Sequence, residues 1–296
     1  MRITTAICTR GRSPYLDQAV ASVLSQEPPA DGISLLIVDD GCPEDVALRL
    51  SALSEKDQRL TLGRTGGGGL SRARNHAAAV CGSGILAFVD DDARMAEGYL
   101  KRLEEFFMRH EDAAAAGGRV IPEVAGLPPP WFSEGMWAWA NGLDLGGSVR
   151  VLHYPEIVYG TNMAFRVSAL QRAGGFDERF GRTGDGMGDC EEAELFLRME
   201  KLGMAVYYDP GLRIVHTLSA DRLTPSYFRE KAYAHGRSCA LLDRIHGRGS
   251  GLFFALAPAA AAAARHLIPP FTASFSRSLA IAHARGYLRQ AWSGTT

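Results

Sequence analysis

Two acidic clusters directly follow short apolar runs, and this pattern constrains the fold more than any other feature of the chain. Asp39-Asp40 comes after residues 35–38, and Asp90-Asp91-Asp92 follows residues 85–89. Short apolar runs that end at turn residues are typical of strands in a buried parallel sheet. Because ligands of open α/β sheets bind outside the carboxyl ends of the strands, we expect these carboxylates to meet at one edge. Their mutual repulsion predicts a divalent cation there, with a ligand rich in hydroxyls and phosphates.

The order of predicted elements indicates an α/β protein. The first strands are expected at residues 3–8, 34–38, 60–62 and 85–89, with helices between them, which predicts a doubly wound, mostly parallel sheet flanked by helices. Beyond Gly98 we expect a helix at 99–110, strands at 113–121, 157–166, 205–208 and 213–216, a helix at 191–202, and a mostly helical tail from Tyr227.

Composition excludes several classes of protein. The net charge of −1 gives no global attraction for nucleic acid. The five cysteines are scattered and form no Cys-x-x-Cys pair, so we expect neither a disulfide framework nor a zinc site, and a reducing compartment fits. Arg10 and Arg12 interrupt the first apolar stretch, so we expect no signal peptide. No apolar run reaches 18 residues, so we expect no spanning helix.

The acidic clusters suit particular ligands. Carboxylate oxygens bind Mg²⁺ or Mn²⁺, and a metal held by Asp92 could bridge a diphosphate. Asp91 could accept a hydrogen bond from a ribose, and Asp39 or Asp40 from a nucleobase N–H or a ribose hydroxyl. The glycine run 66–69 opens a helix that carries Arg72 and Arg74, which suits anion binding.

Two further features have both a chemical and a structural interpretation. One carboxylate of residues 189–194 could be a general base, although acidic residues also stabilise the first turn of a helix. His216 ends an apolar run and is either a metal ligand or a histidine whose hydrogen bonds are satisfied at a strand end.

Seven short motifs follow one another along the chain, and their combined order is more specific than any one of them. They lie at residues 9–12, 38–41, 69–75, 90–92, 160–166, 174–177 and 191–195. The series, which includes the Asp90-Asp91-Asp92 (DXD) motif, resembles the inverting family-2 glycosyltransferases with the GT-A fold, over roughly residues 1–220. The resemblance implies transfer of a sugar from a UDP-, GDP- or dTDP-linked donor to a glycan or glycolipid hydroxyl, with Mg²⁺ or Mn²⁺, in polysaccharide or glycolipid synthesis. It also implies a nucleotide-sugar-binding half at 1–95, an acceptor-binding half at 96–220 and a helical extension at 221–296.

The resemblance assigns roles to individual residues. Thr9 and Asp40 are expected at the base, Arg74 near the base or diphosphate, Asp91 at the ribose, and Asp90 as support for its loop, while Arg12 and Asp39 belong to the same donor site. Asp92 and His216 are the expected metal ligands. Asn162 and Arg166 are expected near the diphosphate and acceptor. Trp131, with Trp137 and Trp139, either forms an acceptor platform or packs a loop onto the core.

The base motif departs from the family pattern. Glu192 stands where Asp is usual, so Glu192 is the expected base, with Glu191 or Asp189 as alternatives. Gly11 also replaces a more frequent aromatic residue or Asn. Two other classes stay open: a metal-dependent nucleotide-sugar pyrophosphorylase or phosphohydrolase, and an inactive sugar-nucleotide-binding module.

The segment 252–268 has three interpretations. It is apolar, but it also carries Arg265 and His266, so it could lie on a membrane surface, be buried, or form a homo-oligomer. We expect a cytoplasmic protein, and the first interpretation would make it peripheral on the inner face of the membrane.

Overall fold

The computed structural model describes residues 1–132, 136–247 and 270–292. The chain divides into two compact units. The first unit comprises residues 1–123, 140–178 and 191–217, and the second comprises 124–139, 179–190 and 218–296.

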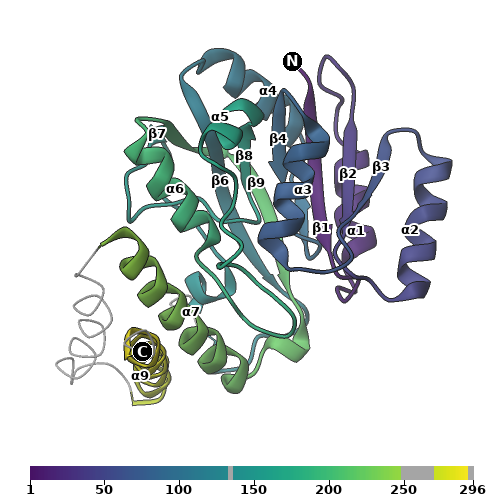
Figure 1. The fold of residues 1–296 in the computed structure, drawn as a ribbon. Coiled ribbons are helices and arrows are strands. Elements are labelled where there is room, and N and C mark those ends of the chain that lie inside the picture. The colour runs from purple at the N-terminus through teal and green to yellow at the C-terminus, as the bar shows by residue number, and fades with distance from the viewer. Residues whose placement is uncertain (133–135, 248–269, 293–296) are drawn as a thin grey trace. The chain divides into compact units, whose positions relative to one another are not determined.

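A nine-stranded mixed sheet lies almost wholly in the first unit (Figure 1). Its order is β3-β2-β1-β4-β8-β6-β9-β5, and β7 pairs with β9. Strands β1 to β4 run parallel to one another, whereas β8 pairs antiparallel with both β4 and β6, and β9 pairs antiparallel with β5 and β7. The strands span β1 Ile3–Thr9, β2 Ser34–Asp39, β3 Leu60–Arg64, β4 Ile85–Phe88, β5 Ala93–Met95, β6 Ala113–Val124, β7 Arg150–Val151, β8 Met163–Arg166 and β9 Ala205–Leu218.

Helices cover both faces of this sheet, so its central strands β2 and β4 are buried on both sides. Ile85 and Ala87 point into one core with side chains of α1 (Leu16–Leu24), α2 (Glu44–Lys56) and α4 (Tyr99–Arg109). The alternate residues Leu86 and Phe88 point into the other core, with α3 (Leu70–Cys81), α5 (Val167–Arg172) and α6 (Glu191–Lys201). This alternation along one strand is the two-residue period of a pleated strand. The predicted α/β class is therefore confirmed.

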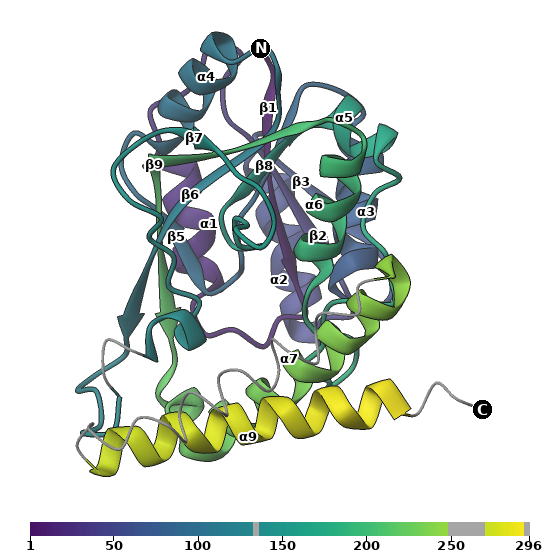
Figure 2. The same cartoon turned by 90° about the vertical axis from the view of Figure 1, so that its left-hand side faces the viewer.

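Two long helices dominate the second unit. α7 (Pro225–His246) begins where the Thr224 hydroxyl accepts a hydrogen bond from the Tyr227 N–H, and Pro225 occupies the first helical position, where no N–H is needed. α9 (Pro270–Trp292) lies beside α7 (Figure 2). Short 3₁₀ helices span Ala138–Ala140 and Ala220–Arg222. No helix among the described residues is both long and apolar enough to cross a membrane.

Several predicted elements need correction. Residues 157–162 are not part of a strand, since β8 begins only at Met163. Residues 205–218 form one continuous strand rather than two. β6 runs through Pro122 to Val124, although a strand end was expected before that proline. The segment 252–268 lies outside the described residues, and the boundaries at 95 and 220 stay a prediction.

Candidate active site

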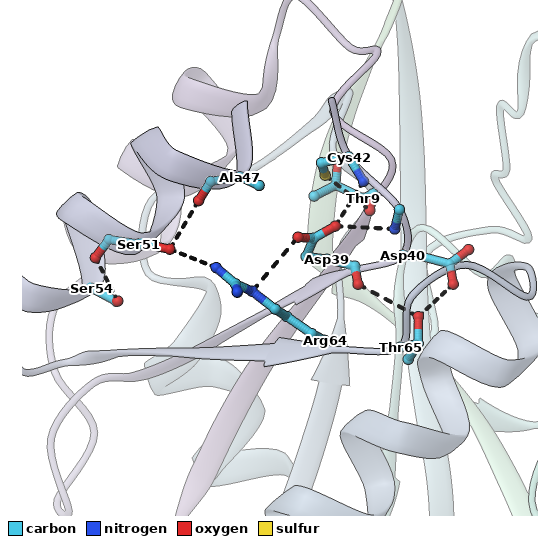
Figure 3. A network of polar contacts seen from close by, with 10 residues as sticks. Thr9, Asp39, Asp40, Cys42, Ala47, Ser51, Ser54, Arg64 and Thr65 are labelled. Carbon is cyan, nitrogen blue, oxygen red and sulfur yellow. Dashed lines mark hydrogen bonds and ion pairs between the residues drawn. The ribbon is translucent and has the colours of Figure 1, made fainter. Parts of the chain in front are cut away.

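The turn after β2 fixes the first acidic pair (Figure 3). The Asp39 carboxylate accepts hydrogen bonds from the backbone N–H groups of Gly41 and Cys42, at 3.0 and 2.7 Å. Asp40 accepts from the Thr65 hydroxyl at 2.5 Å and from the Gly69 N–H at 3.0 Å. Asp40 therefore ties the end of β2 to the glycine run before α3, where Gly69 adopts a φ of +104° that a side chain would disfavour.

The acidic triplet is tied to the loop after β1. The Thr9 hydroxyl donates to the Asp91 carboxylate at 2.5 Å and accepts from the Gly11 N–H at 2.9 Å. The Ser13 hydroxyl donates to the Asp91 carbonyl at 2.9 Å. These contacts follow from the pairing of β1 with β4, and Arg12 lies exposed on the same loop. The structure thus brings Thr9 and Asp91, predicted from motifs 82 residues apart, into direct contact.

The last residue of the triplet meets a histidine from the far end of the sheet. β5 pairs with β9 so that Ala93 faces His216, and the Thr217 N–H bonds the Asp92 carbonyl at 2.8 Å. His216 Nε2 lies 3.3 Å from an Asp92 carboxylate oxygen, and the two residues are only 3 and 7 % exposed. Within the described part of the chain, no protein atom hydrogen-bonds His216 Nδ1.

This pair fits a divalent cation. An octahedral Mg²⁺ or Mn²⁺ ion with ligands at about 2.1 Å holds neighbouring ligand atoms about 3 Å apart. The 3.3 Å separation of the Asp92 oxygen and His216 Nε2 is close to that value. A buried carboxylate beside a buried imidazole nitrogen is also the mixed oxygen and nitrogen donor set that such ions accept.

Arg74 joins the acidic triplet to the start of α6. Its guanidinium lies 2.9 Å from Glu191 Oε1 and 3.5 Å from Asp90 Oδ1, and it is packed between the rings of Phe88 and Phe176. The side chain is 2 % exposed. Burial alone would lower the pKa of Arg74, but the charges of Glu191, Asp90 and Glu192 outweigh it and raise the pKa. Arg74 is therefore a fixed buried cation among carboxylates.

Glu192, the next residue of α6, is held by a backbone group. Its carboxylate accepts the Gly160 N–H at 3.0 Å. A side chain at position 160 would collide with the Arg74 guanidinium, so the buried arginine would have to shift to admit it. Glycine at the start of the 160–166 motif therefore leaves room for the Arg74 guanidinium, and its N–H positions the Glu192 carboxylate.

Several supporting residues had no assigned role from sequence. Asn75 uses both amide atoms on the backbone of Phe176, at 2.7 and 2.9 Å, which links α3 to the 174–177 motif. Arg198 binds Glu194 on its own helix and also donates to the carbonyls of Ala173 and Gly175. The motifs 69–75 and 174–177 were each visible in the sequence, but their contact was not.

Asn162 acts inside the protein. Its amide oxygen accepts from the Tyr99 hydroxyl at 2.7 Å, and its amide nitrogen donates to the carbonyls of Arg119 and Leu212 at 3.0 and 2.9 Å. The residue is 0 % exposed. It therefore secures the loop that carries Gly160, and a direct contact with the diphosphate or acceptor stays a prediction.

Arg166 is the one predicted site residue that lies at the wrong end of the sheet. β8 runs antiparallel to β4, so Arg166 faces Ile85 at the amino end of β4, whereas Asp90 follows the carboxyl end. Its guanidinium donates to the carbonyls of Ala113, Phe107 and His110. The expectation that Arg166 lies near the diphosphate is therefore wrong.

Trp131 belongs to the second unit. Its ring makes edge contacts with Phe132, Phe228 and Phe275, at centroid distances of 6.0, 5.7 and 5.1 Å. It packs among the rings of its own unit, and its role in acceptor binding stays a prediction.

The fold defines the class of protein. A mannosyltransferase from Pyrobaculum calidifontis, solved with GDP-Man and Mn²⁺, matches with a TM-score of 0.66 at 17 % identity, over 99 % of this chain and 88 % of that one. GalNAc-T7, solved with UDP, GalNAc and Mn²⁺, matches with a TM-score of 0.56 at 13 % identity, over 90 % of this chain and 58 % of that one. These likenesses place the chain among the GT-A folds.

The family follows from the sequence match. Residues 4–174 match the model described as glycosyl transferase family 2, so the chain belongs to this family and is a glycosyltransferase. A glucosyl-dolichyl phosphate glucuronosyltransferase of Haloferax volcanii is 27 % identical over 84 % of this chain and 80 % of its own length. A pre-mycofactocin glycosyltransferase of Mycobacterium tuberculosis is 27 % identical over 72 % of this chain and 42 % of its own length.

Proposed function

We propose that this glycosyltransferase is metal-dependent and inverting, and that it moves a sugar from a nucleoside-diphosphate sugar to a hydroxyl of a glycan or glycolipid. The observation that carries the proposal is the bridge made by Arg74. This one buried cation contacts Asp90 of the acidic triplet and Glu191 at the start of α6. A donor-binding loop and a candidate base are thereby brought to the same edge of the sheet.

Asp92 and His216 are the residues that would hold Mg²⁺ or Mn²⁺. When bound, the ion supplies positive charge that stabilises the leaving nucleoside diphosphate. Mn²⁺ accompanies GDP-Man in the Pyrobaculum structure and UDP in the GalNAc-T7 structure, which supports this choice of metal. Asp91 is assigned to the ribose, and Thr9, Arg12, Asp39 and Asp40 to the nucleotide end of the donor.

Glu192 is the best candidate for the base. Glu191 is engaged by Arg74 at 2.9 Å, and the Asp189 carboxylate is engaged by His235 at 2.9 Å and by the Cys190 N–H at 2.7 Å. Glu192, by contrast, is oriented by the neutral backbone N–H of Gly160 at 3.0 Å. It would take the proton of the acceptor hydroxyl as that oxygen attacks the anomeric carbon and the bond to the diphosphate breaks. One such displacement inverts the configuration.

A lipid-linked acceptor is part of the proposal. The Haloferax relative is a glucosyl-dolichyl phosphate glucuronosyltransferase, so its acceptor is named as a lipid-linked sugar. An acceptor of this kind would bring the present chain to a membrane surface as a peripheral protein. Flotation with liposomes of anionic phospholipid tests this point, and complete recovery of the protein in the unbound fraction at low salt would contradict it.

The donor is identified by a thermal-shift screen. UDP, GDP, dTDP and their common sugar conjugates are tested with and without Mn²⁺, against the wild type, Asp92→Ala and the control Asp45→Ala, which alters an exposed residue of α2. A ligand that binds the native state raises the melting temperature. We expect a Mn²⁺-dependent rise with one nucleotide family, kept in Asp45→Ala and lost in Asp92→Ala.

Two outcomes would contradict the proposal. If no nucleotide raises the melting temperature, the chain does not bind a nucleotide-sugar donor under these conditions, and the proposed donor site is wrong. If the identified donor is hydrolysed at the same rate with and without any acceptor, the phosphohydrolase alternative replaces the transferase.

A further inference from the structure

The second unit contains a compact cluster of sulfur and nitrogen side chains. Cys190 precedes α6, His235 and Cys239 lie on α7, and His283 lies on α9. Ligand atoms of Cys190, His235 and Cys239 all lie within 4.8 Å of one another. Cys190 is buried, and the other two residues are half-buried. The chemistry of glycosyl transfer uses none of these groups.

The spacing of these atoms is that of a coordination shell. The two sulfur atoms are 3.9 Å apart, and His235 Nε2 lies 3.5 Å from the Cys239 sulfur. A tetrahedral Zn²⁺ ion with Zn–S of about 2.3 Å and Zn–N of about 2.0 Å holds two sulfurs about 3.8 Å apart and a sulfur and a nitrogen about 3.5 Å apart. Both observed separations are close to these values, and the Cys190 sulfur lies 3.8 Å from the other ring nitrogen of His235, Nδ1.

The helices present these ligands for structural reasons. His235 and Cys239 are four residues apart on α7, which places them on one face of the helix. Between them, Gly236 lets α7 approach the α9 backbone at His283, because an added side-chain carbon would collide with the His283 carbonyl. The His283 ring centroid lies 5.3 Å from that of His235. The crossing of the two helices thus brings a second imidazole to the cluster as a candidate fourth ligand.

Two features of the surroundings favour metal binding by these side chains. The Asp189 carboxylate lies 2.9 Å from His235 Nδ1, which orients the ring so that Nε2 faces Cys239. Carboxylates in this position are typical partners of metal-bound histidines. Cys190 has a φ of +72°, a left-handed conformation that is uncommon for any residue with a side chain. Such a conformation persists where surrounding contacts hold it in place.

We propose that Cys190, His235, Cys239 and His283 bind a structural Zn²⁺ ion, with Asp189 as the carboxylate that orients His235. Two sulfurs and two imidazole nitrogens form a typical closed zinc site. The sequence predicted no zinc site, because the five cysteines are scattered and form no Cys-x-x-Cys pair. Cys190 and His235 lie 45 residues apart and come together only in the fold. Cys190 directly precedes Glu191, the first residue of α6. A bound ion would therefore fix the position of the residue just before this helix.

Metal analysis of the full-length protein tests the site. We expect roughly one zinc per chain after purification under reducing conditions. The measurement is made in an Asp92→Ala background, so that the separate Asp92–His216 pair does not contribute. Cys190→Ser and Cys239→Ser should each lose the zinc, whereas the matched control Cys81→Ser, a buried cysteine of the first unit, should keep it.

Cobalt replaces zinc in a second measurement, which begins with the wild-type protein and so does not depend at first on the folding of any variant. Co²⁺ added to reduced, metal-free protein should give the intense visible bands of a tetrahedral ion and a thiolate charge-transfer band. His235→Cys should still bind Co²⁺ and strengthen the charge-transfer band. Asp189→Asn should weaken zinc binding about 10–100-fold.

The proposal is overturned by any of three results. The reduced wild-type protein takes up neither zinc nor cobalt, or Cys190→Ser and Cys239→Ser keep the zinc of the parent. Alternatively, mass spectrometry finds Cys190 and Cys239 joined as a disulfide in protein whose reduced form binds no metal, which would make the cluster a redox pair instead.

Discussion

The molecule contains two regions suited to metals, and they differ in both chemistry and construction. The sheet edge offers the carboxylate of Asp92 and the imidazole of His216, whereas the helical unit offers two sulfurs and the imidazole of His235. A carboxylate with an imidazole suits Mg²⁺ or Mn²⁺, and sulfur with imidazole suits zinc. The edge is assembled by strand order, and the cluster is assembled by a helix crossing. If both proposals hold, this chain keeps a catalytic ion and a structural ion apart by the chemistry of their ligands.

The cysteines show the same contrast. Burial, with help from Asp90, Asp40 and Asp91 and against the charge of Arg74, raises the pKa of the Cys8 thiol to about 12. A hydrogen bond from Cys190, together with the charge of His235, lowers the pKa of Cys239 to about 3. The carboxylate-rich region keeps its thiols protonated, whereas the imidazole-rich region favours a thiolate.

The largest expected effect comes from removing the proposed base, which should change the rate of transfer and leave both proposed metal sites intact. Glu192→Gln should slow release of nucleoside diphosphate in the presence of acceptor about 10²–10⁴-fold, because an amide cannot take the acceptor proton. Mn²⁺-dependent nucleotide binding and zinc content should not change. Initial rates and thermal shifts measure this, with Glu200→Gln on the exposed side of α6 as the control. A normal rate in Glu192→Gln together with a lost rate in Glu191→Gln would transfer the role to Glu191.

The second prediction concerns the buried cation of the sheet edge. Arg74→Met should lower the free energy of unfolding by about 3–5 kcal/mol, because Asp90 and Glu191 lose the charge that compensates their burial. Urea denaturation measures the loss. The exposed neighbour Arg72→Met should stay within about 0.5 kcal/mol of the wild type. Equal losses of unfolding free energy in the two variants would show that the charge of Arg74 does not compensate the burial of Asp90 and Glu191.

The third prediction tests the close approach at Gly160. Gly160→Ala should cost about 1–3 kcal/mol of unfolding free energy, since the added methyl collides with the Arg74 guanidinium. Gly147→Ala is the matched control, because nothing lies within 4 Å of the carbon it would add. Combined with Arg74→Met, the Gly160→Ala cost should shrink, and a fully additive double variant would contradict the proposed collision.

The smallest effect is the reactivity of the thiols in zinc-free protein. Iodoacetamide at pH 7 should alkylate Cys239 before Cys8, because the thiolate is the nucleophile and only Cys239 has a pKa below 7. The pKa of Cys8 in the folded protein lies above its ordinary value of 9.0. Its contribution to the free energy of unfolding is therefore fully present below pH 9 and is lost as the pH rises toward 12. Peptide mapping gives the order of labelling, and prior labelling of Cys8 would reverse the comparison.

The sequence predicted the sheet edge better than it predicted the cluster of cysteines and histidines in the second unit. The apolar runs that form β1, β2 and β4 predicted their strands to within about one residue, because burial on both faces leaves a continuous signal. β5 has only three residues, too few for a pattern, yet its pairing places His216 beside Asp92. Arg166 was misplaced because a strand's direction in a sheet is decided by distant partners. The Cys190 cluster needs a helix crossing that no local motif encodes.

The pairing of β5 with β9 also sets an order of assembly for the newly made chain. Arg94 and Thr217, which bond across this pairing beside Ala93 and His216, are separated by 123 residues. Contacts of such long range form slowly, whereas β1 to β4 can pair through short βαβ units. A ribosome would have to release β9 before Asp92 could meet His216. The emerging amino-terminal strands would therefore stay unable to bring Asp92 and His216 together until β9 has been made.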